Sequence, residues 1–116
     1  MRLVAEVSSN HARDLARCLA FVDAAADAGC DAVKFQQFRI DELFASAALA
    51  AHPELGERRD WELPEVFNAD LAARAHARGL AFASTPFYRS AVGLLAPLVD
   101  FFKVASYQLL WTDLLR

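Results

Sequence analysis

The sequence predicts an α/β protein with a mainly parallel sheet, and three observations favour this fold class. Short apolar runs alternate along the chain with helical stretches, which is the order typical of βα units. Three of these runs share one plan of a breaker, four or five apolar residues and then polar residues, and they read AGCDAVKF, RGLAFAST and LVDFFKVAS. The composition, 56% hydrophobic and 23% charged over 116 residues, excludes a disordered or low-complexity chain.

The first half of the chain predicts two strands around one long helix. Leu3 to Val7 is the first expected strand, and Ala32 to Phe35 is the second, followed by polar Gln36 and Gln37. Between them, Gly29 ends a stretch whose apolar residues recur at the spacing of one helical face. These apolar residues are Leu15, Cys18, Leu19, Val22 and Ala26.

A long connection from Phe38 to Leu63 follows the second strand. Asp41 is expected to cap a short Ala-rich helix that ends near Ala51, where His52 and Pro53 break it. The charged run ERRD comes next and suits a solvated segment. Long excursions of this kind usually build or cover a site.

The second half of the chain predicts two more strands and two more helices. Pro64 suits the first turn of a helix that Gly79 closes. The elements expected after it are a strand over 80–83, a helix around 90–96, a strand over 101–105 and the start of a helix within 106–116.

Charge and hydropathy exclude two classes of partner. A net charge of −3 leaves no broad cationic face for nucleic acid. Every apolar stretch is interrupted before the roughly 20 residues that a membrane span needs. Glu6 falls where a signal peptide would be apolar, and Cys18 and Cys30 form neither a disulfide framework nor a metal-ligand spacing, so we expect a cytoplasmic protein.

The two lysines carry the strongest chemical signal, because both lie inside runs that read as buried strand. Alternation along a strand puts Lys34 and Gln36 on one face, with Val33 and Phe35 on the face toward the helices. The same parity places Glu6 on the interior face of the first strand and Thr85 on that of the third. Since ligands bind at the carboxyl ends of parallel strands, these polar groups define a candidate site.

Two interpretations of this site remain open from the residues alone. A glutamate and two lysines aimed at one interior could form a structural ion-pair network. Alternatively, Lys34 and Lys103, with the hydroxyls of Thr85 and Ser106, supply the donors that a phosphate and a carboxylate need. His11 in the first loop reads as a polar loop residue more readily than as a metal ligand. The serines lack a nucleophile-elbow context, which argues against a hydrolase.

Four motifs in order and register resemble the N-terminal half of the sialic acid synthase family. They are AEVSSNH at 5–11, DAGCDAVKFQQF at 27–38, RGLAFASTPF at 78–87 and FFKVAS at 101–106. The family covers N-acetylneuraminate, pseudaminic and legionaminic acid synthases, and the resemblance extends over nearly the whole chain.

The resemblance implies a TIM (β/α)₈ barrel that condenses phosphoenolpyruvate with an N-acetylated aminosugar, of the N-acetylmannosamine type. A divalent metal, Mn or Mg, is expected for the complete family enzyme, and the products are a nine-carbon ulosonic acid and phosphate. Residues 1–116 would be the first three βα units and the fourth strand of that barrel, without the C-terminal antifreeze-like cap domain. We therefore expect little or no turnover from these residues alone, and a homo-oligomer, because the family's cap completes the sugar pocket across a dimer.

The resemblance also assigns roles to individual residues. Glu6 matches an acidic residue near the reacting centre, Gln36 matches a position that contacts the sugar, and Asn10 with His11 match an Asn-His pair of the site architecture. The residues that match phosphoenolpyruvate-binding positions are Lys34, Thr85, Lys103 and Ser106.

Three departures from the family pattern stand out. Ala12 and Arg13 replace a common Asn-Gly, and Gln108 replaces a common Glu, which removes an ionisable group from the site architecture. The family's metal-binding histidines lie on later strands, so we expect no metal ligand in these residues.

Alternative functions remain open beside the synthase. The chain could be a stand-alone half barrel that binds phosphoenolpyruvate or a phosphosugar, or a non-catalytic remnant. Another phosphoenolpyruvate-dependent 3-deoxy-ulosonic acid synthase is the second alternative, although Gln36 and the STPF segment match it less well.

Overall fold

The computed structural model describes all 116 residues, and its centre is one parallel sheet. The four strands lie in sequence order, as the alternation of βα units predicts. They are β1 (Val4–Glu6), β2 (Ala32–Gln37), β3 (Ala81–Pro86) and β4 (Phe101–Phe102). In register, Ala32 lies opposite Val4 on one side and Ala81 on the other.

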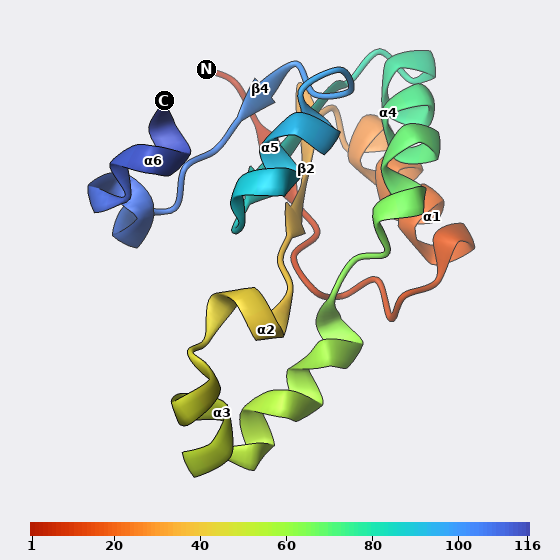
Figure 1. Cartoon of the computed structure of the whole chain (residues 1–116). Coiled ribbons are helices and arrows are strands. Elements are labelled where there is room, and N and C mark those ends of the chain that lie inside the picture. The colour runs from red at the N-terminus through yellow and green to blue at the C-terminus, as the bar shows by residue number, and fades with distance from the viewer.

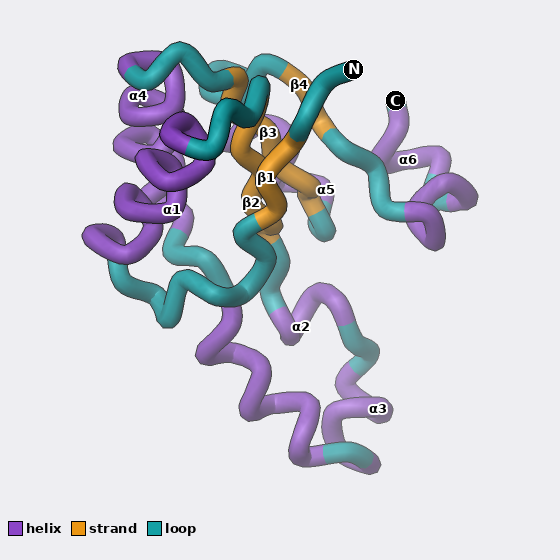
Figure 2. The backbone as a smooth tube through the Cα atoms, turned by 180° about the vertical axis from the view of Figure 1, so that it is seen from behind, coloured by secondary structure: helices purple, strands orange, loops and turns teal.

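Three helices cover one face of this sheet and leave the other face open. They are α1 (Leu15–Asp27), α4 (Asn68–Ala77) and α5 (Arg89–Leu95). Helices α1 and α4 lie side by side, and α5 packs beside β3 (Figure 1). Seen from behind, the strands face the viewer with no helix in front of them (Figure 2).

The hydrophobic core lies between the sheet and these helices. Val33, Phe35 and Phe82 are fully buried there, and the two phenylalanine rings lie 6.2 Å apart. Val33 and Phe35 therefore face the helices, which confirms the predicted parity of β2. Gly29 and Gly79 follow α1 and α4 with φ near +75°, the left-handed conformation that ends a helix with little strain in glycine.

The long connection folds as a separate lobe beyond the carboxyl ends of the strands (Figure 1, bottom). It contains α2 (Ile40–Leu43), α3 (Ser46–Ala51) and the 3₁₀ helices η1 (Pro53–Trp61) and η2 (Glu65–Phe67). The prediction of one helix capped by Asp41 is wrong, because Asp41 lies inside α2 and its carboxylate pairs with Arg59. Pro64 precedes η2 instead of lying in the first turn of α4.

The last strand is shorter than the predicted run over 101–105. It has only β3 as a neighbour, and the chain turns away before η3 (Ser106–Leu110) and α6 (Thr112–Leu115). The buried Gln108 holds this turn: its Oε1 accepts from Ala105 N at 2.9 Å, and its Nε2 donates to the Pro86 carbonyl at 2.8 Å. These two bonds stabilise the turn by which the backbone leaves the sheet.

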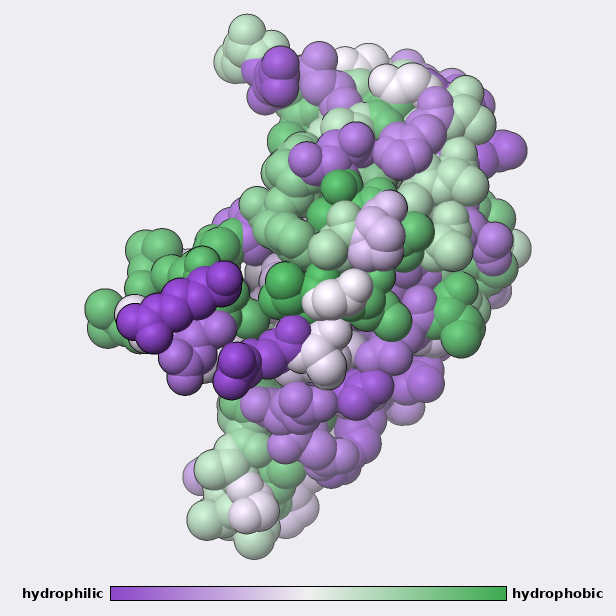
Figure 3. All heavy atoms as spheres, turned by 45° about the horizontal axis from the view of Figure 1, so that its top comes forward, coloured by the Kyte–Doolittle hydropathy of each residue, from purple (hydrophilic) through white to green (hydrophobic).

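Hydrophobic side chains remain exposed on the C-terminal segment. Tyr107, Leu109 and Leu110 are all more than half exposed, and hydrophobic atoms gather on the arm that projects at the left of the space-filling view (Figure 3). No helix of the protein has the length and apolar character needed to cross a membrane.

Candidate functional site

The open face of the sheet brings three of the predicted site residues into contact at its carboxyl edge. Register places Glu6 opposite Lys34, and the Lys34 ammonium forms an ion pair with the Glu6 carboxylate. The same Nζ lies 3.2 Å from Thr85 Oγ1 on β3. Strand parity predicted this grouping, because all three side chains leave their strands on the face away from the helices. We call these residues the carboxyl-edge cluster.

The cluster combines a nearly buried cation with an accessible anion. The Lys34 side chain is 9% exposed, whereas that of Glu6 is 40% exposed. Glu6 Oε1 also accepts a hydrogen bond from Ser8 N at 3.0 Å, which fixes the carboxylate. A lysine ammonium has three N–H donors, and the contacts with Glu6 and Thr85 use two of them. One donor is left for a ligand oxygen.

The two remaining predicted anion-binding residues lie just beyond the neighbouring strand β4 and form no hydrogen bond or ion pair with the cluster. Lys103 directly follows β4, where its backbone N–H donates to the Ser84 carbonyl at 3.1 Å. Its side chain is exposed and has no hydrogen-bond or ion-pair partner, and Ser106 at the start of η3 is exposed as well. Lys103 is thus a free cation at the edge that carries Thr85, although its run was expected to be buried.

Gln36 lies one step further along the same face of β2. It is opposite Thr85 in the register and lines a hollow of about 280 Å³ at the carboxyl edge. The hollow lies between the first loop, the long connection and the start of the segment after β3. Its lining residues are Ser8, Ser9, Gln36, Phe38, Ile40, Leu43, Arg58, Trp61, Phe87 and Tyr107.

Asn10 and His11 build the first loop rather than reaching the cluster. Asn10 Nδ2 donates to the Val7 carbonyl at 2.9 Å, and His11 Nδ1 accepts from Arg13 N at 3.0 Å. His11 is 1% exposed, and burial lowers the pKa of its imidazole below the ordinary 6.5. A ring that accepts at Nδ1 and stays neutral carries its proton on Nε2.

The same loop holds non-glycine residues in a left-handed conformation. Ser8, Ala12 and Arg13 have φ values of 55°, 50° and 54°. The family's Asn-Gly at the last two positions suits this geometry, whereas Ala and Arg adopt it at a cost. Arg13 adds a bond of its own, because its Nη1 donates to the Arg59 carbonyl at 2.8 Å.

Sequence reasoning missed a buried polar network on the helix-facing side of the same edge. Gln37 Nε2 donates to the Leu63 carbonyl at 3.0 Å, and Asn68 Nδ2 donates to Gln37 Oε1 at 2.8 Å. Nearby, the Tyr88 hydroxyl donates to Glu65, and burial, together with this contact, raises the pKa of the phenol. Gln37, Asn68 and Tyr88 are each 1% exposed. The network fastens the long connection to the sheet, and only strand parity at Gln37 could have indicated it.

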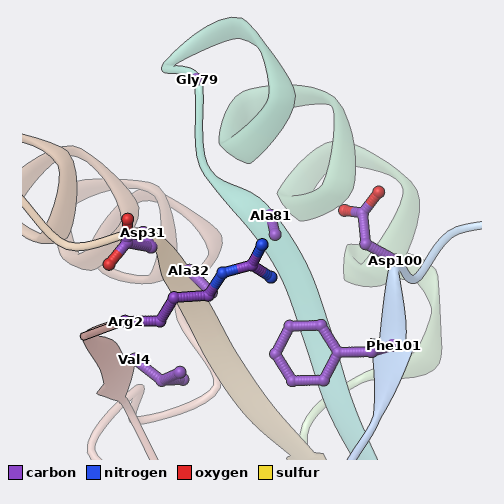
Figure 4. A pocket seen from close by; sticks show the side chains of 8 residues that line it. All are labelled: Arg2, Val4, Asp31, Ala32, Gly79, Ala81, Asp100 and Phe101. Carbon is purple, nitrogen blue, oxygen red and sulfur yellow. The ribbon is translucent and has the colours of Figure 1, made fainter.

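The largest hollow of the molecule is at the opposite end of the strands. It measures about 710 Å³, and Figure 4 shows Arg2, Asp31 and Asp100 around it. Both carboxylates accept hydrogen bonds from backbone N–H groups. Asp31 Oδ2 accepts from Leu3 N at 2.7 Å, and Asp100 Oδ2 accepts from Phe82 N at 2.7 Å. Since ligand sites of parallel sheets lie at the carboxyl ends, we assign this hollow a structural role.

No group of three or more His, Cys, Asp or Glu side chains lies close enough together to hold a metal ion. In the carboxyl-edge cluster the single carboxylate is already paired with Lys34. The residues present therefore do not fit the divalent metal that the resemblance implies.

Solved structures define the class of this fold, which corresponds to the N-terminal part of a TIM barrel. The chain superposes with a TM-score of 0.85 on an N-acetylneuraminic acid (sialic acid) synthetase from Leptospira borgpetersenii, at 29% identity, covering 97% of this chain and 39% of that one. It superposes with a TM-score of 0.77 on the Bacillus subtilis spore coat polysaccharide biosynthesis protein SpsE, at 30% identity, covering 98% of this chain and 32% of that one.

The family follows from the sequence match. The NeuB family model matches residues 21–116, and the chain belongs to this family. It is also 32% identical over 115 residues to an N,N'-diacetyllegionaminic acid synthase from Campylobacter jejuni, covering 90% of this chain and 34% of that one. The chain spans about a third of the length of the curated relatives that it matches.

Proposed function

We propose that this chain is the N-terminal part of a synthase that condenses phosphoenolpyruvate with an N-acetylated aminosugar to a nine-carbon ulosonic acid and phosphate. The observation that carries the proposal is the carboxyl-edge cluster of Glu6, Lys34 and Thr85, in a chain of the NeuB family. The names of relatives support the substrate class, since they make N-acetylneuraminic and N,N'-diacetyllegionaminic acids.

The reaction explains why the site needs cations and hydroxyls. Carbon 3 of the enol attacks the sugar aldehyde carbon, whose oxygen takes up a proton, while water adds at carbon 2 and phosphate leaves with the C–O bond electrons. The substrate carries a phosphate and a carboxylate, so the site must hold several negative charges and place two reactants together. Donors that are fixed before binding do this best.

Each residue of the site has a role in this proposal. The free donor of Lys34 and the hydroxyl of Thr85 bind phosphoenolpyruvate oxygens, and Lys103 and Ser106 bind from the adjacent strand and turn. Glu6, held by Lys34 and Ser8 N, lies near the reacting carbons as the acidic residue. Gln36 contacts the sugar, while Asn10, His11 and Gln108 shape the loops around it.

The wider protein context is part of the same proposal. Residues 1–116 form the incomplete N-terminal part of the barrel, so we expect no turnover from them alone; ulosonic acid formed by the purified chain would contradict this. No step is assigned here to a divalent metal, because this chain offers no fitting ligand set. We also propose a cytoplasmic homo-oligomer that acts on small molecules, and not on nucleic acid or a membrane. The net charge of −3 supports only the exclusion of nucleic acid.

Calorimetric titration of the 116-residue chain with phosphoenolpyruvate tests the proposal. Lys34→Ala removes the ammonium, and we expect its affinity to fall at least about tenfold, the loss of one charge-assisted contact. Arg2→Ala is the matched control, because it deletes an exposed cation at the other end of the strands. Equal affinity of Lys34→Ala and the parent chain would refute the assignment.

A further inference from the structure

We propose that the hollow between the first loop and the long connection selects the acyl substituent of the acceptor sugar, with Arg58 and Trp61 as its specificity-determining residues. The inference deepens the proposed function and rests on it. It is carried by the composition of the hollow, by the free guanidinium of Arg58 and by the contacts that hold its rim in place.

The hollow adjoins the carboxyl-edge cluster. Gln36 lies two residues beyond Lys34 on one face of β2, and Ser8, another lining residue, donates its N–H to Glu6. A sugar whose aldehyde reaches the cluster would therefore extend its other substituents into this space. At about 280 Å³, the hollow is of the size needed for such a group rather than for a whole macromolecular ligand.

The side chains of Arg58 and Trp61 lie on the same face of helix η1 and contact each other. Side chains three residues apart eclipse each other in a 3₁₀ helix, and the Arg58 guanidinium lies 5.4 Å from the centre of the Trp61 ring. Arg58 forms no ion pair, whereas its neighbour Arg59 is paired with Asp41. The N–H groups of Arg58 are thus available to a ligand oxygen.

The rim is fixed rather than loose. The Arg59 carbonyl accepts from Arg13 Nη1 at 2.8 Å, and the Arg59 side chain pairs with Asp41. Ile40 N donates to Glu62 Oε1 at 2.7 Å just beyond η1. The first bond joins η1 to the first loop, and the other two join the start of the long connection to its end, so little ordering is required on binding.

Aromatic rings form the other side of the hollow. The rings of Phe38 and Phe87 lie 6.2 Å apart edge to face, and those of Phe87 and Tyr107 lie 6.1 Å apart. An acetamido group matches this lining, because its methyl fits against aromatic carbon and its carbonyl oxygen accepts from a guanidinium. A bare hydroxyl can accept from the guanidinium but lacks the methyl, whereas an ammonium offers neither contact and would be repelled by Arg58.

Competition between sugars on the 116-residue chain, saturated with phosphoenolpyruvate, tests the inference. We expect N-acetylmannosamine to bind at least about tenfold more tightly than mannose, measured by saturation-transfer NMR. Arg58→Ala and Trp61→Ala should each reduce that ratio severalfold without changing the affinity for phosphoenolpyruvate, and Arg2→Ala should change neither.

The outcomes separate the two claims. An unchanged ratio in Arg58→Ala, or no sugar binding to a chain that does bind phosphoenolpyruvate, overturns the subsite and leaves the proposed function standing. A chain that binds no phosphoenolpyruvate overturns the proposed function, and the subsite falls with it.

Discussion

The substitution Gln108→Glu probes the turn that ends β4, because it changes one group and keeps the shape. Gln108 is 3% exposed, with its carbonyl oxygen bonded to Ala105 N and its amide N–H bonded to the Pro86 carbonyl. A carboxylate can still accept from Ala105, but it sets a negative oxygen against the Pro86 oxygen. The lost bond and the buried charge should cost about 3 kcal/mol of unfolding free energy at pH 7.

Urea unfolding at pH 7 and near pH 4 measures this cost. Protonation of the new carboxyl restores an O–H donor toward Pro86, so the deficit relative to the parent chain should shrink at the lower pH. Gln36→Glu is the control, because it makes the same change at a half-exposed position that forms no hydrogen bond, and we expect it to stay within about 0.5 kcal/mol of the parent. A Gln108→Glu chain as stable as the parent at pH 7 would refute the role given to this amide.

Three further predictions concern the loops around the site. Ala12→Gly should stabilise the chain by about 0.5–1 kcal/mol in urea, because it relieves a φ of 50°, and a destabilised variant would contradict the assigned strain. Tyr88→Phe should cost about 1.5 kcal/mol through the lost bond to Glu65, and no change would show that the bond contributes nothing. The pKa of His11 is lowered by burial, so unfolding free energy should fall as pH drops below the ordinary 6.5, where only the unfolded chain binds the proton. His11→Gln should flatten this slope, whereas His52→Gln, at an exposed ring, should not.

Strand parity predicted the part of the site that depends only on alternation. Glu6, Lys34 and Thr85 were placed on one face from sequence, and the register brings them together. Alternation along a strand does not predict where the strand ends, so the exposure of Lys103, which directly follows the short β4, was not foreseen. The apolar residues around Lys103 predict a buried strand, because strands of parallel sheets are usually apolar on both faces.

The missed features depend on contacts distant in sequence. Gln37 reads as a loop residue because it is polar and ends an apolar run, yet it bonds the Leu63 carbonyl 26 residues away. Asp41 looks like a helix cap because the local signal favours it, but an arginine 18 residues away takes its carboxylate. Helix propensity and capping signals depend only on residues that are close in sequence. The hydrogen-bond partners of polar side chains such as Gln37 and Asp41 are instead set by tertiary contacts.

Amide chemical-shift mapping during titration with phosphoenolpyruvate tests the central claim most directly, since the two ends of the strands report separately. The account predicts that the largest shifts fall at the carboxyl edge, around Lys34 and Thr85 and next to Lys103 and Ser106. In Lys34→Ala the same shifts should require at least about tenfold more phosphoenolpyruvate. Shifts gathered instead around Asp31 and the other residues of the amino-end hollow would contradict it.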